Sequence, residues 1–476
     1  MLHTSTYQMS FVIVRQHNNM CLLRYCKAAL CRRICTLQRF KCCPVTQAQA
    51  YRGMAVLKPE KMERDIDSDV DKIEASLYVH WPYCERRCSY CNFNKYIDNS
   101  VDHEKMARCL SQEAKSLIAI SGVQVITSIF FGGGTPSLAI PKTFETVIDT
   151  VAREASLKTN AEITMEANPT SAERGKLQDF RAAGINRLSL GVQSLSDKNL
   201  RLLNRDHSVK DTIECLQFAK KLFPKKCSVD VIFGLPGQSV EDLSIELGCM
   251  LELCDDHLSM YQLTLERGTS LFKQVKEGNL CVPDSELVAV MYAYAVNFLE
   301  EKGYNRYEVS NFAKSYEAES SHNKSCWHGQ QYLGIGPGAH GRFIPYGEGL
   351  SERQARVQTL EPKPWMWEVE HKGHATRKAV TQSKKEILEE LVTLGVRTKE
   401  GISHRRWASF NPPASLVDIF LNQEEVRGLI EAGYLMITDA GISPSKLGMN
   451  VADKLAVALI SGLETFYAQE NMTDVQ

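Results

Sequence analysis

Aspartate and glutamate are absent from the first 59 residues, although this segment contains nine lysine and arginine residues. A basic, acid-free segment with serine and threonine residues and an amphipathic stretch at 21–37 is typical of a mitochondrial transit peptide. A disordered cytosolic extension is the alternative interpretation. Long hydrophobic runs are also missing, because the run Phe11–Val14 is too short for a secretory signal core or a membrane span. We therefore expect residues 1–59 to be a cleavable mitochondrial presequence.

The rest of the chain lacks an excess of positive charge. After residue 59 there are 47 basic and 57 acidic residues, so this body carries a formal charge of about -10, within a total of -1 for 476 residues. An acidic body argues against a nucleic-acid-binding surface. The 16 cysteines do not form the paired framework of a small secreted protein, since six lie in the first 59 residues and seven others are scattered singly. A reducing compartment is therefore expected.

The three remaining cysteines, Cys84, Cys88 and Cys91, have C-x-x-x-C-x-x-C spacing and follow an apolar stretch that begins at Leu77. Three thiolates from one short loop suit three corners of an iron-sulfur cluster, which leaves the fourth iron open for another ligand. A structural zinc site is one alternative, but such sites have four ligands and no second C-x-x-C follows in the sequence. Unligated core thiols are the third interpretation.

Short apolar runs alternate with helical patterns from residue 76 onward. Strands are predicted at 77–80, 128–131, 162–166, 187–191, 228–233, 258–263 and 304–309, with helices near 102–120, 141–154, 171–183, 209–222, 239–253 and 284–302. Regular alternation of strands and helices favours parallel strands joined by right-handed crossovers. The sequence therefore predicts an α/β fold, an open or partial (β/α) barrel.

Polar residues and glycines gather where these predicted strands end. After the cysteine loop come Gly132–Gly134 behind the second strand, Glu166 at the end of the third, Gln193 behind the fourth and Asp230 in the fifth. Barrel enzymes carry their chemistry at the carboxyl ends of the strands. We therefore expect these side chains to meet at one mouth.

Sequence motifs add a family resemblance to this pattern. The cysteine motif, with Tyr78-x-His80-x-Pro82 before it, Asn92-Phe93 after it and Gly132-Gly-Gly-Thr-Pro136 further on, resembles the radical S-adenosylmethionine (SAM) superfamily. Within it, the chain is similar to the group of oxygen-independent coproporphyrinogen dehydrogenase and the HemW-type haem chaperones, from about residue 77 to the C-terminus. The resemblance implies a partial barrel that binds a 4Fe-4S cluster and SAM.

The same resemblance implies a set of SAM-contacting residues, and the residues themselves leave simpler interpretations open. Glu166 is otherwise a surface carboxylate, and Arg205 an exposed arginine at a helix end. Asp230 is less easily explained this way, because an acid in an otherwise apolar strand is seldom buried without a partner. The residues that match the family's SAM contacts are Tyr78, Tyr90, Gly133, Gly134, Thr135, Glu166, Gln193, Arg205 and Asp230.

A second motif, Ser321-His-Asn-Lys-Ser-Cys-Trp327, resembles the H-N-x-x-Y-W haem-associated motif of the chaperone branch. His322 is a candidate axial ligand, and Trp327 is expected to offer a flat apolar surface to the macrocycle. The usual tyrosine is Cys326 here, which is either a haem ligand or a small packed hydrophobe. Phe93 stands where the dehydrogenase branch has a further cysteine, so the resemblance favours a haem chaperone without coproporphyrinogen dehydrogenase activity. A radical SAM oxidoreductase acting on a porphyrinogen or unknown substrate is the alternative.

The domain organisation predicted from these patterns has five segments. They are the presequence at 1–59, a charged linker at 60–75, the radical SAM barrel at 76–311, a connecting region with the haem-associated motif at 312–382, and a winged-helix-like domain at 383–470. A chaperone of this branch is expected to deliver haem to client haemoproteins, and the resemblance makes a homodimer a further expectation. Neither nucleic acid nor a membrane is predicted as a partner.

Overall fold

The structure is a computed structural model that describes residues 72–98 and 100–473. The predicted presequence and most of the predicted linker lie outside these residues. The first strand begins at Glu74. No helix among the described residues is long and apolar enough to cross a membrane.

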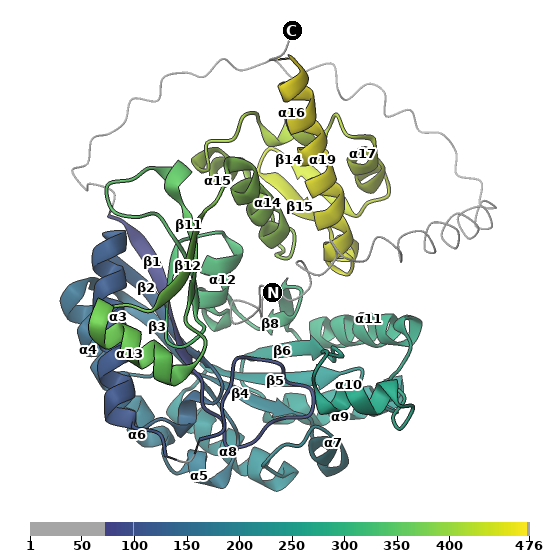
Figure 1. Ribbon diagram of the computed structural model, residues 1–476. Coiled ribbons are helices and arrows are strands. Elements are labelled where there is room, and N and C mark those ends of the chain that lie inside the picture. Colours follow the sequence, from purple (N-terminus) through teal and green to yellow (C-terminus); the bar gives the residue numbers. More distant parts are fainter. Residues whose placement is uncertain (1–71, 99, 474–476) are drawn as a thin grey trace. The chain divides into compact units, whose positions relative to one another are not determined.

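Parallel strands form the centre of the fold (Figure 1). They are β1 (Glu74–Trp81), β2 (Val125–Gly133), β3 (Ser156–Ala167), β4 (Arg187–Gln193), β5 (Cys227–Phe233) and β6 (His257–Gln262), and they lie side by side in chain order. The connections contain α3 (His103–Ser121), α4 (Pro141–Glu154), α5 (Ser171–Arg174), α6 (Leu177–Ala182), α7 (Asp197–Leu202), α8 (Val209–Leu222) and α9 (Val240–Leu253). The predicted alternation of strands and helices is confirmed.

The sheet continues at both ends and does not close into a barrel. On one side β9 (Tyr332–Ile335) runs parallel to β1, followed by antiparallel β10 (His340–Phe343), β11 (Gln354–Gln358) and β12 (Thr376–Thr381). On the other side β8 (Asn311–Ala313) pairs with β6, and β7 (Asn305–Glu308) pairs with β8. The predicted strand at 304–309 therefore exists, but the expectation that it is a parallel barrel strand is wrong. Only two residues separate β7 from β8, and such a short connection joins antiparallel strands.

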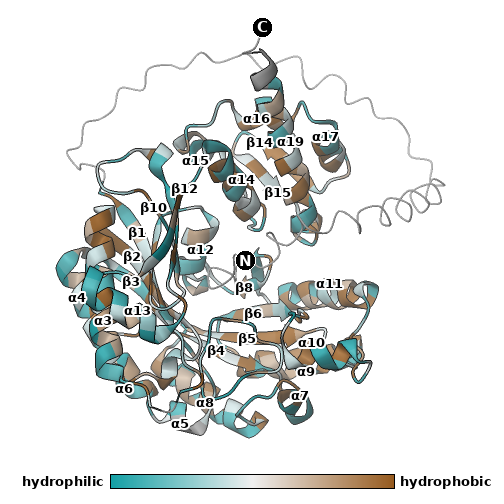
Figure 2. Ribbon diagram, in the orientation of Figure 1, coloured by the Kyte–Doolittle hydropathy of each residue, from teal (hydrophilic) through white to brown (hydrophobic). Residues whose placement is uncertain are grey.

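Alternation along the central strands separates an apolar face from a polar one. Leu77 and Val79 of β1 and Phe131 of β2 belong to the main hydrophobic core. The helices that cover this face are amphipathic, as Figure 2 shows for α3 and α4. Ser128 and Thr164 are buried on the opposite face of the sheet. This polar inner face positions the candidate site.

The remaining elements form a helical edge, a connecting region and a C-terminal unit. The first two contain α10 (Ser270–Lys276), α11 (Ser285–Glu301), α12 (Ser321–Trp327) and α13 (Pro362–Lys372). The C-terminal unit has its own core and consists of α14 (Lys384–Gly395), β13 (Ile402–Ser403), α15 (His404–Ser409), α16 (Leu416–Phe420), α17 (Glu424–Glu431), β14 (Leu435–Thr438), β15 (Gly441–Pro444), α18 (Lys446–Met449) and α19 (Ala452–Thr473). Helices around a small antiparallel sheet agree with the predicted winged-helix-like region.

Candidate functional site

The three motif cysteines lie in the loop that follows β1, and each is partly buried. The hydroxyl of Thr135 donates to Sγ of Cys84 at 3.4 Å, and Nη1 of Arg205 donates to Sγ of Cys88 at 3.3 Å. Hydrogen bonds to sulfur stabilise a thiolate relative to a thiol. The loop therefore receives donors from the segment behind β2 and from the segment between α7 and α8.

Burial changes the acidity of two of these thiols. It raises the pKa of Cys84 to about 12, with the Thr135 hydrogen bond opposing it, and it also raises the pKa of Cys91. A metal displaces such protons, because thiolates are the binding form. Within residues 72–98 and 100–473, no three His, Cys, Asp or Glu side chains converge closely enough to hold a single metal ion.

The glycine run behind β2 packs directly against the chain that leads into the cysteine loop. Gly134 N–H donates to the carbonyl of Trp81 at 2.7 Å, and a Cβ atom at this position would lie 2.6 Å from the carbonyl oxygen of Tyr83. Gly133 has a φ of +114°, a conformation that favours glycine, and its N–H donates to Oε2 of Glu166 at 3.0 Å. A side chain at Gly134 would collide with backbone, so the close approach requires glycine.

Two buried carboxylates influence one another, Glu166 near the end of β3 and Asp230 in the middle of β5. Burial and the charge of Asp230 raise the pKa of Glu166 to about 8, against the Gly133 hydrogen bond. Burial raises the pKa of Asp230 to about 6, although the hydroxyl of Ser189 donates to both of its oxygens at 3.1 and 3.0 Å. Near neutral pH Glu166 therefore retains a proton that an isolated carboxyl group would lose, whereas Asp230 is largely ionised. Together the two groups can both donate and accept hydrogen bonds.

Arg205 joins the cysteine loop to β4 and to the end of β3. Its Nη2 donates to Oδ1 of Asn168 at 2.6 Å and to the carbonyl of Gly191 at 2.9 Å, whereas the buried Nε has no hydrogen-bond partner among the described residues. Gln193, the last residue of β4, has a φ of +69°, which is unfavourable for a residue with a side chain. Its amide nitrogen would lie 2.9 Å from a Cβ atom at Gly191. Sequence reasoning missed Asn168, whose only signal is its place directly after β3.

Of the two candidate tyrosines, Tyr78 lies in β1 and Tyr90 lies within the cysteine loop. The hydroxyl of Tyr78 lies 3.1 Å from Nδ1 of His80, whose Nε2 lies 2.9 Å from the carbonyl oxygen of Asn94. Burial lowers the pKa of His80 to about 4, so this imidazole is neutral at pH 7. Tyr90 packs against a small hydrophobic cluster formed by Leu203, Ile232 and Leu235. Burial raises the pKa of its hydroxyl, which stays protonated.

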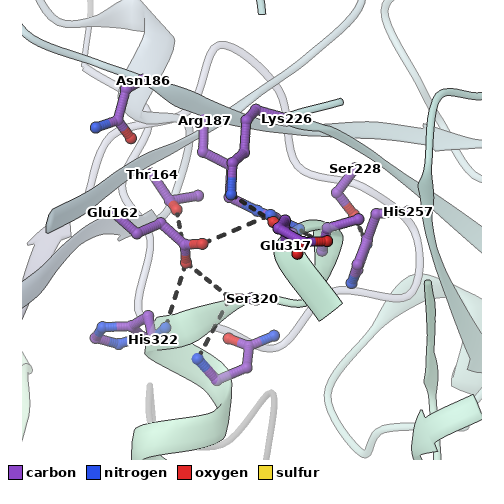
Figure 3. A network of polar contacts seen from close by, with 12 residues as sticks. Glu162, Thr164, Asn186, Arg187, Lys226, Ser228, His257, Glu317, Ser320 and His322 are labelled. Carbon is purple, nitrogen blue, oxygen red and sulfur yellow. Dashed lines mark hydrogen bonds and ion pairs between the residues drawn. The ribbon is translucent and has the colours of Figure 1, made fainter. Parts of the chain in front are cut away.

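His322 lies on α12 and is buried against β2. Its Nδ1 is 3.1 Å from the hydroxyl of Ser128, and its ring stacks on Phe130 with 5.0 Å between the ring centres. Its backbone N–H donates to Oε1 of Glu162 at 3.3 Å (Figure 3). Burial lowers the pKa of His322 to about 4, so the ring is neutral at physiological pH. A neutral imidazole has one nitrogen lone pair available for a metal.

The other two residues of the haem-associated motif are buried as well. Cys326 is buried, and burial raises the pKa of its thiol to about 12, which fits a small packed side chain. Trp327 is only 1% exposed, and the guanidinium of Arg397 covers its ring at 5.1 Å from the centre. The expectation that Trp327 presents a flat surface to a macrocycle is therefore wrong for this structure, because the ring is already packed.

Comparison with known proteins places this geometry in a family. The profile of the radical SAM superfamily matches residues 78–245, and that of the HemN C-terminal domain matches residues 382–451. The chain is 48% identical over 404 residues to radical S-adenosyl methionine domain-containing protein 1, mitochondrial, of Danio rerio, covering 85% of this chain and 91% of the relative. The chain belongs to this family. It is also 35% identical to the heme chaperone HemW of Bacillus subtilis, covering 70% of this chain and 86% of HemW.

A solved structure supports the fold assignment. Coproporphyrinogen III oxidase (HemN) from Escherichia coli superimposes with a TM-score of 0.67 at 21% identity, covering 82% of this chain and 90% of that enzyme. The predicted resemblance and fold class are therefore confirmed.

The family implies a 4Fe-4S cluster and SAM, and the residues present fit both groups. Cys84, Cys88 and Cys91 offer three thiols from one loop, with hydrogen-bond donors already directed at two of them. At Gly134 a Cβ atom would collide with the backbone of Tyr83, so glycine is needed for β2 to approach the chain that leads into the cysteine loop. Glu166 of β3 contacts the glycine run, and Arg205 contacts both Gly191 of β4 and Cys88 of this loop.

Proposed function

We propose that this protein is a mitochondrial haem chaperone, which binds haem, a 4Fe-4S cluster and SAM and passes haem to client haemoproteins. Cys84, Cys88 and Cys91 would hold the cluster, and the groups at the ends of β1 to β5 would hold SAM. Close relatives are named mitochondrial, which supports a cleavable presequence within residues 1–59. Delivery of haem is proposed because HemW relatives bear the name heme chaperone.

The observation that carries this proposal is the unequal hydrogen bonding of two buried histidines. His257 uses both ring nitrogens, with Nδ1 at 2.7 Å from Ser228 and Nε2 at 2.8 Å from the hydroxyl of Tyr307. His322 uses Nδ1 alone, and none of the described residues hydrogen-bonds to its Nε2. We infer that Nε2 of His322 is the axial ligand for haem iron.

The bound groups and the protein residues have different roles in this proposal. When bound, the cluster and SAM supply the radical chemistry shared by the superfamily. The chain's own part is to orient SAM through Gly133, Gly134 and the carboxylates, and to keep the thiols of the cysteine loop shielded. Arg205 places positive charge beside Cys88. Cys326 is proposed to be a packing residue, because its thiol is buried and protonated.

A radical SAM oxidoreductase is the second candidate, because the chain has both the cysteine motif and the residues that match the family's SAM contacts. The position of Phe93 argues against the porphyrinogen version, since the dehydrogenase branch has a cysteine there. Catalysis would require turnover that depends on the cluster. Haem transfer requires only that haem is bound and released.

One experiment separates these candidates. Anaerobically reconstituted protein is titrated with haem by its Soret absorbance and then assayed for coproporphyrinogen consumption, beside a Cys88→Ala variant. We expect stoichiometric haem binding without turnover, an altered Soret band in His322→Ala, and an unchanged band in the matched Cys326→Ala. Turnover that disappears in Cys88→Ala would identify an enzyme instead. A Soret band unaffected by His322→Ala would refute the assignment of the ligand.

A further inference from the structure

Two serine-histidine pairs lie on the inner face of the sheet, and they differ in one respect. In both pairs a serine hydroxyl from a central strand contacts Nδ1 of a buried histidine, at 3.1 Å for Ser128 and His322 and at 2.7 Å for Ser228 and His257. The second histidine is bonded at Nε2 as well, which is sufficient to explain it as a structural group. In the first pair, Ser128 contacts Nδ1 of His322, and none of the described residues hydrogen-bonds to Nε2 of that ring. This second nitrogen is therefore available to a ligand.

We propose that Ser128 is a positioning residue for haem ligation, which holds the proton of His322 on Nδ1 and leaves the lone pair on Nε2. This inference rests on the proposed function of His322. The Nδ1–H group donates to Oγ of Ser128, so the imidazole becomes a stronger donor toward iron. Histidines that bind metals commonly donate their second ring N–H to an acceptor, which fixes the tautomer and raises the basicity of the ligand.

Phe130 restricts the same ring from its face. It stacks on His322 with an interplanar angle of 27°, and it lies on β2 two residues after Ser128. Side chains two residues apart on a strand point to the same face. One strand therefore determines both the plane of the imidazole and the direction of its Nδ1–H bond.

The backbone of His322 is fixed independently of β2. Oε1 of Glu162 on β3 accepts from His322 N–H at 3.3 Å and from the hydroxyl of Ser320 at 3.1 Å, while Arg187 on β4 donates to the carbonyl of Ala318 at 2.9 Å (Figure 3). The start of α12 is therefore attached to β3, and the segment just before it is attached to β4. A change at Ser128 alters the ring of His322 without removing this anchor.

The test compares Ser128→Ala with Ser228→Ala in the full chain, because both changes remove a buried serine-histidine hydrogen bond. The readouts are the haem dissociation constant from Soret titration, the midpoint potential of the bound haem and the iron content of the cluster. We expect Ser128→Ala to weaken haem binding by about 10–100-fold. The potential is expected to rise, because a less basic imidazole stabilises ferric iron less. Ser228→Ala is expected to leave both haem readouts at the wild-type values.

Three outcomes distinguish the inference from the function on which it rests. If His322→Ala changes the haem spectrum while Ser128→Ala leaves affinity and potential unchanged, the role of Ser128 is refuted and the ligand stands. If His322→Ala leaves the spectrum unchanged, the ligand assignment itself fails. Equal shifts in Ser128→Ala and Ser228→Ala would show a structural effect and overturn the inference. Ser128→Thr keeps the hydroxyl group, so a wild-type potential in this variant would support a role for the hydroxyl even if Ser128→Ala fails to fold.

Discussion

The ion pair between Glu162 and Arg187 gives a stability prediction that follows directly from its burial. The two side chains are only 4% and 2% exposed, and Nη1 of Arg187 lies 3.5 Å from Oε2 of Glu162. Neither of these two atoms makes a hydrogen bond within the described part of the chain. The pair is therefore dry but not ideally aligned, so its attraction offsets little more than the cost of burying the charges.

The loss of unfolding free energy in each variant depends on which charge the substitution leaves without a partner. Glu162→Leu leaves the Arg187 guanidinium buried without an anion, and removal of one partner from a buried pair costs about 3–5 kcal/mol of unfolding free energy. Arg187→Met leaves Glu162 as an unpaired acid and is expected to cost a similar amount. The double variant removes both charges at once. Because the double variant leaves no buried charge without a partner, we expect it to be more stable than either single variant.

Urea denaturation followed by circular dichroism measures these differences on the metal-free chain, with Ser228→Ala as a control for loss of an ordinary hydrogen bond. The control is expected to lose about 1 kcal/mol. The reasoning fails if either single variant at the pair loses no more than this control. It also fails if the double variant loses the sum of the two single losses, since independent contributions add and paired charges do not.

Two further predictions concern other sites. Arg205→Lys removes the branched contacts with Cys88, Asn168 and Gly191, so SAM binding to reconstituted protein should weaken by about 10–100-fold, at roughly 1.5–3 kcal/mol for hydrogen bonds to a charged group. An unchanged SAM affinity at equal cluster content would contradict this. Burial raises the pKa of Glu113 to about 7, against hydrogen bonds from Gly336, Ala375 and Trp365. The native state then binds more protons than the unfolded chain between pH 4.5 and 7, so stability falls as pH rises through this range, by up to about 3 kcal/mol. In melting curves from pH 5 to 8, the advantage of wild type over Glu113→Gln should therefore shrink, and a constant difference would refute it.

The sequence predicted the parts of the site that follow from local pattern and from motif. Polar residues at strand ends were expected to meet, and the contact between Gly133 and Glu166 shows that those two strand ends do. The end of each strand can be recognised in the sequence as the point where an apolar run stops. Consecutive strands of such a fold are usually adjacent in the sheet, so the order of the strands follows from their order in the chain. The motif spacing gave the cysteines directly.

Other parts could not be predicted because their contacts join distant segments. Ser128 and His322 are 194 residues apart, and neither residue has a neighbour in sequence that indicates the other. Trp327 was expected to be available to a ligand, because the motif around it does not indicate any contact with Arg397. In the structure, the guanidinium of Arg397, which belongs to the C-terminal unit, lies over the ring of Trp327. The antiparallel strands at the two edges of the sheet were missed for a different reason, since β8 and β10 have only three and four residues and are too short to show a clear period.

Gly132 connects the two halves of the proposed function. A Cβ atom at this position would lie 2.8 Å from Phe130, 3.1 Å from Tyr78 and 3.2 Å from Oε2 of Glu166. Phe130 stacks on His322, whereas Glu166 and Tyr78 belong to the proposed SAM site. The groups proposed for haem and for SAM therefore pack around one glycine of β2, with no space between them for an added methyl group. Because close-packed interiors have low compressibility and transmit strain, we expect a shift of Glu166 upon SAM binding to be felt at Phe130 across Gly132, and through the stacked rings at His322.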